Sequence, residues 1–250
     1  MPQKLPRAVI FDLDGTLALP WQPPSENTLL KLSALSQRTN VAILSGAEFQ
    51  RIYDSVLLRL PLETRQGNFW VLSVNGAHAH LYEDGLWKKT RDESLSSKNK
   101  DDIRAAITEY ENAEGTPQSA HGEKMVDRQG FIAYTPLGVE VPADIKTSWD
   151  PEQSKRKSII TNLRARLSDE YDLYIAGQST VDIVRKNANK AGGIRWLAQK
   201  LGTEPRTMLF IGDALYPGGN DYVVIETGIA TKQVQNPQET ADIIDELLKI

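Results

Sequence analysis

The feature that most constrains this chain is a short apolar segment at residues 8–11, which two aspartates end abruptly. The segment Ala-Val-Ile-Phe is rich in residues that favour strands, and Asp12-Leu13-Asp14-Gly15-Thr16 follows it directly. A short apolar run bounded by turn residues is typical of a strand buried in a core. The sequence therefore predicts a buried strand that runs into a turn carrying two carboxylates.

A regular alternation of helices and strands continues from this segment. After a proline-rich loop, Ser25 can cap a helix in which Leu29, Leu32 and Leu35 recur at helical spacing. The next expected elements are a strand at 41–44, a helix at 47–60 and a strand at 69–74. This order implies parallel pairing in a sheet that helices cover on both faces.

The alternation changes in the middle of the chain. The elements expected there are a helix at 97–113, two strands within 124–134 that reverse at Gln129-Gly130, a helix at 152–167, and strands at 173–176 and 180–184. A helix followed by antiparallel strands thus occurs twice. The earlier alternation returns with a helix at 191–201, a strand at 207–211 and a terminal helix at 237–248.

The order of elements predicts an α/β fold with two domains. Residues 1–84 and 188–250 would form a Rossmann-like, doubly wound parallel core, and residues 85–187 an inserted α+β domain. A chain of 250 residues is long enough for this arrangement.

The composition excludes several classes of function. The 29 basic and 33 acidic residues are mixed along the chain and give a net charge of −4, so no basic face is offered to nucleic acid or to a membrane. The absence of cysteine excludes disulfides, thiolate metal sites and a cysteine nucleophile. No apolar run approaches membrane-spanning length. We therefore expect a soluble, cytoplasmic protein.

The two aspartates suit phosphoryl transfer. Side chains two residues apart at a strand end lie on the same side, so Asp12 can attack phosphorus while Asp14 gives and takes protons. Crowded carboxylates repel one another unless a hard cation lies between them, and Mg²⁺ prefers oxygen ligands. Asp213, at the end of another expected strand, can complete such a site because parallel strands end at one edge of the sheet.

The segment Asp12-Leu13-Asp14-Gly15-Thr16 resembles the first motif of the haloacid dehalogenase superfamily, most of whose members are phosphatases and phosphotransferases. The resemblance extends to the later motifs in their order along the chain, which are Ser45-Gly46, Lys190, Gly212-Asp213 and Asn220-Asp221. It implies that Ser45 and Gly46 bind the phosphoryl group and that Lys190 neutralises the nucleophile and phosphate. It also implies a Mg²⁺ site made by Asp12, Asp14, Asp213, Asn220 and Asp221.

The segment 212–221, Gly-Asp-Ala-Leu-Tyr-Pro-Gly-Gly-Asn-Asp, is similar to the last motif of the α-phosphomannomutases, which belong to the type-IIB branch of the superfamily. These enzymes move phosphate between two hydroxyls of a hexose through a bisphosphate. The resemblance implies that the inserted domain is a cap in which Thr180 and Asp182 contact the sugar and Arg128 grips the distal phosphate. A homodimer paired through the cap is an option that the resemblance raises and the sequence leaves open.

Three positions depart from the mutase pattern. Trp21, His121 and Val139 stand where mutases carry arginines, so each departure removes a permanent cation. Arg128, Lys124 and a protonated His121 remain to hold a bisphosphate away from water.

Three functions therefore stay open. The first is a phosphohexose mutase, the second a sugar-phosphate phosphatase with the same fold and chemistry, and the third an inactive module that binds a sugar phosphate. The identity of the hexose is not decided. We interpret His78 and His80, which alternate after Asn75-Gly76, as exposed strand residues and not as a metal pair.

Overall fold

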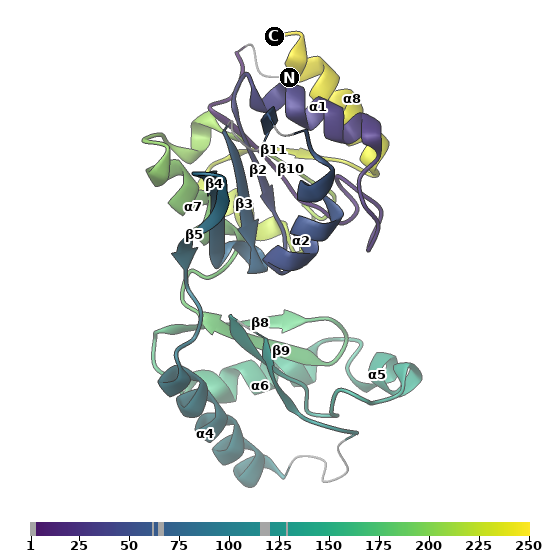
Figure 1. Cartoon of the computed structure of the whole chain (residues 1–250). Helices are drawn as coiled ribbons and strands as arrows, with labels where there is room; N and C mark the ends of the chain where they lie inside the picture. The colour runs from purple at the N-terminus through teal and green to yellow at the C-terminus, as the bar shows by residue number, and fades with distance from the viewer. Residues whose placement is uncertain (1–3, 62, 65–67, 116–120, 129) are drawn as a thin grey trace. The chain divides into compact units, whose positions relative to one another are not determined.

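The computed structural model describes residues 4–61, 63–64, 68–115, 121–128 and 130–250. These residues form two compact units (Figure 1). The core unit contains the chain up to Asp92 together with Asn189–Ile250, and the inserted unit contains Glu93–Ala188. Each unit has a sheet and a hydrophobic core of its own.

The core unit is built on a seven-stranded sheet in the order β11-β10-β1-β2-β3-β4-β5. Its strands are β1 (Ala8–Phe11), β2 (Asn40–Leu44), β3 (Phe69–Ser73), β4 (His78–Glu83), β5 (Leu86–Asp92), β10 (Leu209–Gly212) and β11 (Ala230–Gln233). The strands from β11 to β3 pair in parallel, and β4 and β5 extend the sheet as antiparallel strands. The predicted α/β class with a mostly parallel core is confirmed.

Helices cover both faces of this sheet (Figure 1). The helices are α1 (Glu26–Ser36), α2 (Phe49–Ser55), α7 (Lys190–Lys200) and α8 (Pro237–Leu248), with short 3₁₀ turns at Leu57–Arg59, Val74–Gly76, Pro205–Thr207 and Tyr222–Thr227. Along β1, Val9 and Phe11 pack with α1, α2 and α8, whereas Ala8 and Ile10 pack with α7. Successive side chains of a strand point to opposite faces, so an entirely apolar strand is required between two helix layers.

Helix α1 begins where the sequence predicts. The hydroxyl of Ser25 accepts a hydrogen bond from the backbone N–H of Thr28 at 3.1 Å, which satisfies one of the free donors of the first turn. Lys31 of this helix reaches Asp245 of α8 at 2.6 Å. The N-terminal and C-terminal parts of the chain are thereby joined on one face of the core sheet.

The inserted unit contains an antiparallel sheet in the order β6-β7-β9-β8. Its elements are α4 (Ser97–Glu114), β6 (Met125–Arg128), β7 (Phe131–Tyr134), α5 (Ala143–Trp149), α6 (Ser154–Arg164), β8 (Tyr171–Ala176) and β9 (Thr180–Arg185). Residues of α4 and α6 pack against Ile132, Val181 and Ile183 in one core. The opposite face of the same strands carries Thr180 and Asp182. The reversal expected at Gln129-Gly130 involves Gln129, which lies outside the described residues.

Some elements differ from the sequence expectation. Strand β5 lies in the core sheet, paired with β4, whereas the insert was expected to start at 85. The reason is that β5 is an edge strand with the sequence Leu-Trp-Lys-Lys-Thr-Arg-Asp, which lacks the apolar run of the inner strands. Helix α5 was not expected, because none of its residues is buried and its apolar pattern is weak.

The interpretation of His78 and His80 as exposed was wrong. Both are buried, with relative exposures of 3% and 5%. The ring of His80 stacks on Phe49 of α2 with centroids 3.9 Å apart, and Nε2 of His78 lies 3.3 Å from Asp92. Burial is the main cause that lowers the pKa of both imidazoles, that of His80 to about 4. They are neutral packing residues.

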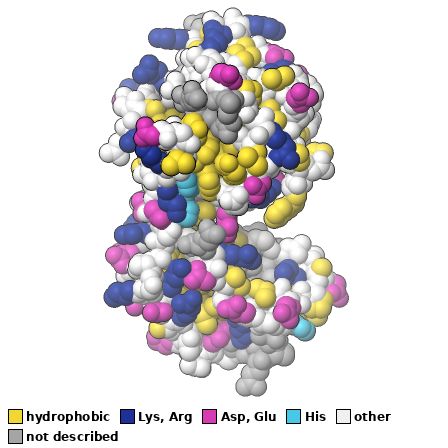
Figure 2. All heavy atoms as spheres, viewed as in Figure 1, with side chains coloured by type: hydrophobic (Ala, Val, Ile, Leu, Met, Phe, Trp, Pro, Cys, Tyr) yellow, Lys and Arg dark blue, Asp and Glu magenta, His cyan; other side chains and the backbone are white. Residues whose placement is uncertain are grey.

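Side chains of both charge signs are interspersed over the face shown in Figure 2. Among the described residues, no helix combines the length and the apolar character that crossing a membrane requires.

Candidate active site at the carboxyl edge of the core sheet

The carboxyl ends of the parallel strands bring several of the predicted residues together. Asp12 follows β1, Ser45 follows β2 and Asp213 follows β10. The backbone N–H of Asp12 donates to the carbonyl of Ile211 at 2.9 Å, which continues the pairing of β1 and β10 to the edge. Because neighbouring parallel strands end on one side of a sheet, residues about 200 positions apart become neighbours there.

Lys190 joins two of the carboxylates. Its Nζ atom lies 2.6 Å from Oδ1 of Asp12 and 2.5 Å from Oδ1 of Asp221, and all three side chains are buried. Oδ2 of Asp221 accepts a hydrogen bond from the backbone N–H of Ala214 at 3.2 Å, which fixes this carboxylate. The result is a charged triad of one cation and two anions.

Helix α7 places Lys190 at this edge. Its N-terminal cap is Asn189, whose side chain accepts from the N–H of Gly192 at 2.8 Å. The helix approaches the turn after β3 closely, since a Cβ atom on Gly76 would lie only 2.9 Å from the Cα atom of Gly193. Gly76 also has a φ of +86°, so glycine is required at this contact.

Burial and neighbouring charges shift the pKa values in the triad. Burial raises the pKa of Asp12 from 3.8 to about 6; Lys190 lowers it and Asp221 raises it. Burial alone would lower the pKa of Lys190, but the carboxylates of Asp12 and Asp221 outweigh this effect and raise it. The amine therefore stays charged, whereas ionised Asp12 is held at a cost in free energy.

Asp12, Asp213 and Asp221 form a group that can hold a cation. Each contributes an oxygen atom, and these atoms lie within 4.8 Å of one another. Burial, and then the charge of Asp221, raises the pKa of Asp213. Gly15 is tightly packed against this group, since a Cβ atom there would lie 2.6 Å from Oδ2 of Asp213. Crowded carboxylate oxygens fit a hard divalent ion such as Mg²⁺.

Two further residues were expected in the metal set, Asp14 and Asn220. Asn220 is exposed. Asp14 is not in the group, and its Oδ1 atom instead accepts from the N–H of Trp21 at 3.0 Å and from Nη2 of Arg51 at 2.5 Å. Direct ligation by Asp14 and Asn220 stays a prediction.

Arg51 is a neighbour of the site that the sequence analysis did not identify. It lies in α2, which follows the carboxyl end of β2, and its guanidinium carbon is 4.2 Å from the centroid of the Trp21 ring. Helices that begin after a strand of a parallel sheet start at the ligand-binding edge. That rule was the one available signal for Arg51, because no motif marks this residue.

Asn75 is a second residue near the site that the sequence analysis did not identify, and it contacts the turn at Ser45 and Gly46. The hydroxyl of Ser45 is buried and accepts from the N–H of Ala47 at 3.1 Å. The N–H of Asn75 donates to the carbonyl of Ser45 at 2.8 Å, and a Cβ atom on Gly46 would lie 3.2 Å from Oδ1 of Asn75. The side chain of Asn75 therefore covers the Ser45-Gly46 turn.

The predicted cap residues lie together within the inserted unit. Thr180 and Asp182 are two positions apart on β9 and point to the same face. Burial raises the pKa of Asp182 to about 6, and the charge of Arg128 on β6 lowers it. Arg128 is exposed, as are His121 and Val139. Contact of a sugar phosphate with Thr180, Asp182, Arg128 and His121 stays a prediction.

Lys124, which was expected to help hold a bisphosphate, is paired with a carboxylate of its own unit. Its Nζ atom lies 3.1 Å from Oε1 of Glu111 in α4, and the phenol of Tyr134 donates to the same oxygen at 2.9 Å. The negative charge of Glu111 offsets part of the positive charge that Lys124 could offer to a phosphate. The charge available to a distal phosphate in this unit is therefore smaller than the sequence indicated.

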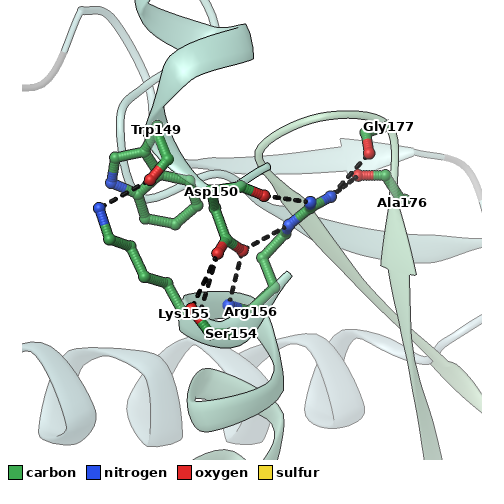
Figure 3. A network of polar contacts seen from close by, with 7 residues as sticks. All are labelled: Trp149, Asp150, Ser154, Lys155, Arg156, Ala176 and Gly177. Atoms are coloured by element: carbon green, nitrogen blue, oxygen red, sulfur yellow. Dashed lines mark hydrogen bonds and ion pairs between the residues drawn. The ribbon is translucent and has the colours of Figure 1, made fainter. Parts of the chain in front are cut away.

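A buried ion pair anchors the turn before Thr180 (Figure 3). Nε of Arg156 donates to Oδ2 of Asp150 at 2.9 Å, and Nη1 donates to the carbonyl of Gly177 at 2.7 Å. The carboxylate of Asp150 also accepts the backbone N–H groups of Lys155 and Arg156, each at 3.0 Å, at the start of α6. Burial would raise the pKa of Asp150, but these hydrogen bonds outweigh it and lower the pKa.

A cavity of about 780 Å³ lies at the opposite edge of the core sheet. It is lined by the residues before β1, the turn before β10 and the start of β11, among them Lys4, Arg7, Arg206 and Lys232. None of the predicted site residues lines it.

Solved structures with a similar fold cover nearly the whole chain. An IMP-bound, N-terminally truncated IMP-nucleotidase of Plasmodium falciparum superposes with a TM-score of 0.67 at 17% identity, over 97% of this chain and 68% of that one. A haloacid dehalogenase-like hydrolase from Bacteroides thetaiotaomicron superposes with a TM-score of 0.63 at 13% identity, over 96% and 99%. At these identities the likeness establishes the fold, which is that of the haloacid dehalogenases.

Sequence relatives are more specific. A phosphomannomutase of Solanum lycopersicum is 25% identical over 236 residues, which are 92% of this chain and 90% of the relative. A phosphomannomutase of Saccharomyces cerevisiae is 23% identical over 248 residues, with coverages of 97% and 94%. The profile of the eukaryotic phosphomannomutases matches residues 28–250. The chain therefore belongs to the eukaryotic phosphomannomutase family.

Proposed function

We propose that this protein is a Mg²⁺-dependent phosphohexose mutase that carries phosphate on Asp12 and converts a hexose 1-phosphate to the 6-phosphate. The observation that carries the proposal is the buried triad of Asp12, Lys190 and Asp221 at the carboxyl edge of the sheet, in a chain of this family. A module that only binds a sugar phosphate has no need of a buried, costly nucleophile.

The proposed reaction has two transfers. The phosphoryl group on Asp12 passes to the 6-hydroxyl of a hexose 1-phosphate, and Asp14 takes the proton of that hydroxyl. The resulting bisphosphate turns over within the site. An oxygen of Asp12 then bonds to the other phosphorus, the bond between that phosphorus and O1 breaks, and Asp14 returns the proton to O1.

The chain's own residues would lower the barrier by fixing charge and position. Lys190 holds Oδ1 of Asp12 and adds a cation next to the phosphoryl group. The backbone at Ser45-Gly46, covered by Asn75, would receive phosphoryl oxygens. A magnesium ion held by Asp12, Asp213 and Asp221 would offset the charge of the phosphate.

The second candidate is a sugar-phosphate phosphatase. It is favoured by the pairing of Lys124 with Glu111, since this leaves Arg128 as the one permanent cation among the residues expected to hold the distal phosphate. If the distal phosphate is held weakly, the site stays open to water while Asp12 still carries the phosphoryl group. Water then attacks that phosphorus in place of a sugar hydroxyl, the bond between phosphorus and Asp12 breaks, and inorganic phosphate leaves.

Phosphorus NMR separates the two reactions. The protein is incubated with Mg²⁺, mannose 1-phosphate or glucose 1-phosphate, and a catalytic amount of the hexose 1,6-bisphosphate. Accumulation of the 6-phosphate supports the mutase, whereas inorganic phosphate identifies the phosphatase. Asp12→Asn is the control and should abolish either product. Turnover that persists in this variant would contradict a phosphoaspartate mechanism.

A further inference from the structure

Arg51, Trp21 and Asp14 form a closed set of contacts in the core unit. Nη2 of Arg51 and the backbone N–H of Trp21 both bind Oδ1 of Asp14, at 2.5 and 3.0 Å. The guanidinium carbon of Arg51 lies 4.2 Å from the centre of the indole ring, which is cation–π geometry. Each residue of the set thus touches the other two.

The conformation of Trp21 is costly. Its φ is +64°, a region that bulky residues rarely adopt, and the residue is 83% exposed. Residues held in sparsely populated backbone conformations cluster at active sites and ligand-binding loops, where the surrounding structure holds them. Here the hydrogen bond to Asp14 holds the backbone, and Arg51 covers one face of the ring.

The contact with Asp14 leaves several N–H donors of the Arg51 guanidinium unused. Its side chain is 25% exposed, and Asp14 is its one polar side-chain partner among the described residues. Nε and Nη1 of the guanidinium remain available for a ligand. The stacking on Trp21 restricts the guanidinium to one orientation, so little conformational entropy is lost when those donors bind.

We propose that Arg51, supported by the indole of Trp21, is a phosphate-binding residue of the core site. It donates its free N–H groups to an oxygen pair of the phosphoryl group next to Asp14, in the bidentate manner that suits guanidinium groups. The proposal rests on the proposed function insofar as that phosphate belongs to a hexose phosphate. It also changes the interpretation of Trp21. The positive charge that mutases carry at this position is supplied here by Arg51 of α2.

Moving the arginine from position 51 to position 21 tests this assignment. The variants are Arg51→Ala, Arg51→Lys, the double variant Trp21→Arg with Arg51→Ala, and Gln50→Ala as a matched control, since Gln50 is exposed on the same helix and contacts Asp54. The probe is inorganic phosphate in the presence of Mg²⁺, with binding measured by calorimetry. The ratio kcat/KM for mannose 1-phosphate and glucose 1-phosphate is measured in parallel.

We expect Arg51→Ala to weaken phosphate binding about tenfold or more, and Arg51→Lys to keep part of it because an ammonium group cannot bind two oxygens in a fixed plane. The double variant should recover affinity to within about threefold of the original protein, because residue 21 is held at the same carboxylate. Gln50→Ala should bind like the original. If Arg51 only positioned Asp14, the double variant would not recover phosphate binding.

Two results would overturn the proposal. One is unchanged phosphate binding in Arg51→Ala. The other is a folded double variant that binds no better than Arg51→Ala. If Arg51→Ala does not fold, the comparison of Arg51→Lys with the double variant decides in the same way. Phosphate binding that depends on Arg51, without turnover of either hexose phosphate, would refute the proposed function and leave this assignment standing.

Discussion

The Nζ atom of Lys190 lies 2.6 Å from Oδ1 of Asp12, although the two residues are 178 positions apart. The contact is buried, and Asp221 shares the same amine. One cation thus compensates two carboxylates that have almost no access to water. Removing it should affect both the chemistry and the stability of the core unit.

Lys190→Met should destabilise the metal-free protein at pH 7.5 by about 3 to 5 kcal/mol, the usual cost of leaving a buried charge unpaired. The loss should shrink as the pH falls from 7.5 toward about 6, because Lys190 lowers the pKa of Asp12 and its removal lets Asp12 take up a proton at higher pH than in the original protein. Chemical denaturation with EDTA present, at pH 5 and 7.5, measures both effects. An equal loss at the two values would show that packing dominates.

Asp12→Asn should stabilise the metal-free protein while it abolishes turnover. Because the pKa of Asp12 is about 6 in the folded protein and 3.8 in the unfolded chain, the folded state binds the proton more tightly. Its contribution to stability is complete below pH 4 and is lost as the pH rises through 6. We therefore expect the free energy of unfolding of Asp12→Asn to be higher than that of the original protein by about 1 to 3 kcal/mol at pH 7.5. Near pH 4 the two free energies should be equal.

Thermal unfolding with EDTA at both pH values measures that difference. Added Mg²⁺ should stabilise the original protein more than Asp12→Asn, because the variant lacks one anionic ligand. A difference between the two proteins that does not change with pH would contradict the assignment of the raised pKa to Asp12.

The parallel core could be predicted because its strands are apolar without interruption. Ala8–Phe11, Asn40–Leu44 and Phe69–Ser73 were placed to within one residue at each end. The terminal helix matched at Pro237–Leu248, where Asn236 caps it and proline occupies the first turn. Strand β5 was not predicted, because an edge strand can carry lysine and arginine on both faces.

The site could be predicted only where a motif marks it. Asp12, Asp213 and Asp221 lie at strand ends or in a motif, and the structure brings them together. Arg51 lies in an ordinary amphipathic helix, and its contacts with Asp14 and Trp21 depend on the path of a loop. Such contacts between distant parts of the chain leave no periodic signal in the sequence.

His80→Phe should make the protein more resistant to acid. The buried imidazole has a pKa of about 4 when folded and 6.5 when unfolded, so the unfolded state gains protons first as the pH falls. Stability is lost between pH 6.5 and 4, by up to about 3 kcal/mol. Phenylalanine keeps the stacking on Phe49 and has no proton to gain.

The measurement is the melting temperature at pH 8 and pH 5. We expect the gain of His80→Phe over the original protein to be larger at pH 5. The matched control is His121→Gln, because it also removes an imidazole, but one that is exposed and not buried. A gain of the same size at both pH values would indicate better packing and not the removal of a titrating group.

Arg156→Ala should destabilise the inserted unit by about 3 to 5 kcal/mol, since Asp150 would keep a buried charge without its partner. The carbonyl of Gly177 would also lose its donor, which frees the turn that leads to Thr180. Amide hydrogen exchange should therefore rise in α6 and in residues 176–180. Lys155→Ala is the control, because its exposed ammonium contacts the carbonyl of Trp149 at the surface. Unchanged exchange in Arg156→Ala would contradict the anchoring role.

The position of β1 between β2 and β10 has a consequence for the order in which the chain folds. Val9 pairs with Val41 on one side and with Leu209 on the other. A ribosome that has released residues 93–188 has delivered a complete inserted unit, which can fold at once. The core unit must wait for residues 189–250, because β1 lacks its neighbour β10 until then. Closing that long loop is slow, and β1 stays exposed to wrong partners during synthesis.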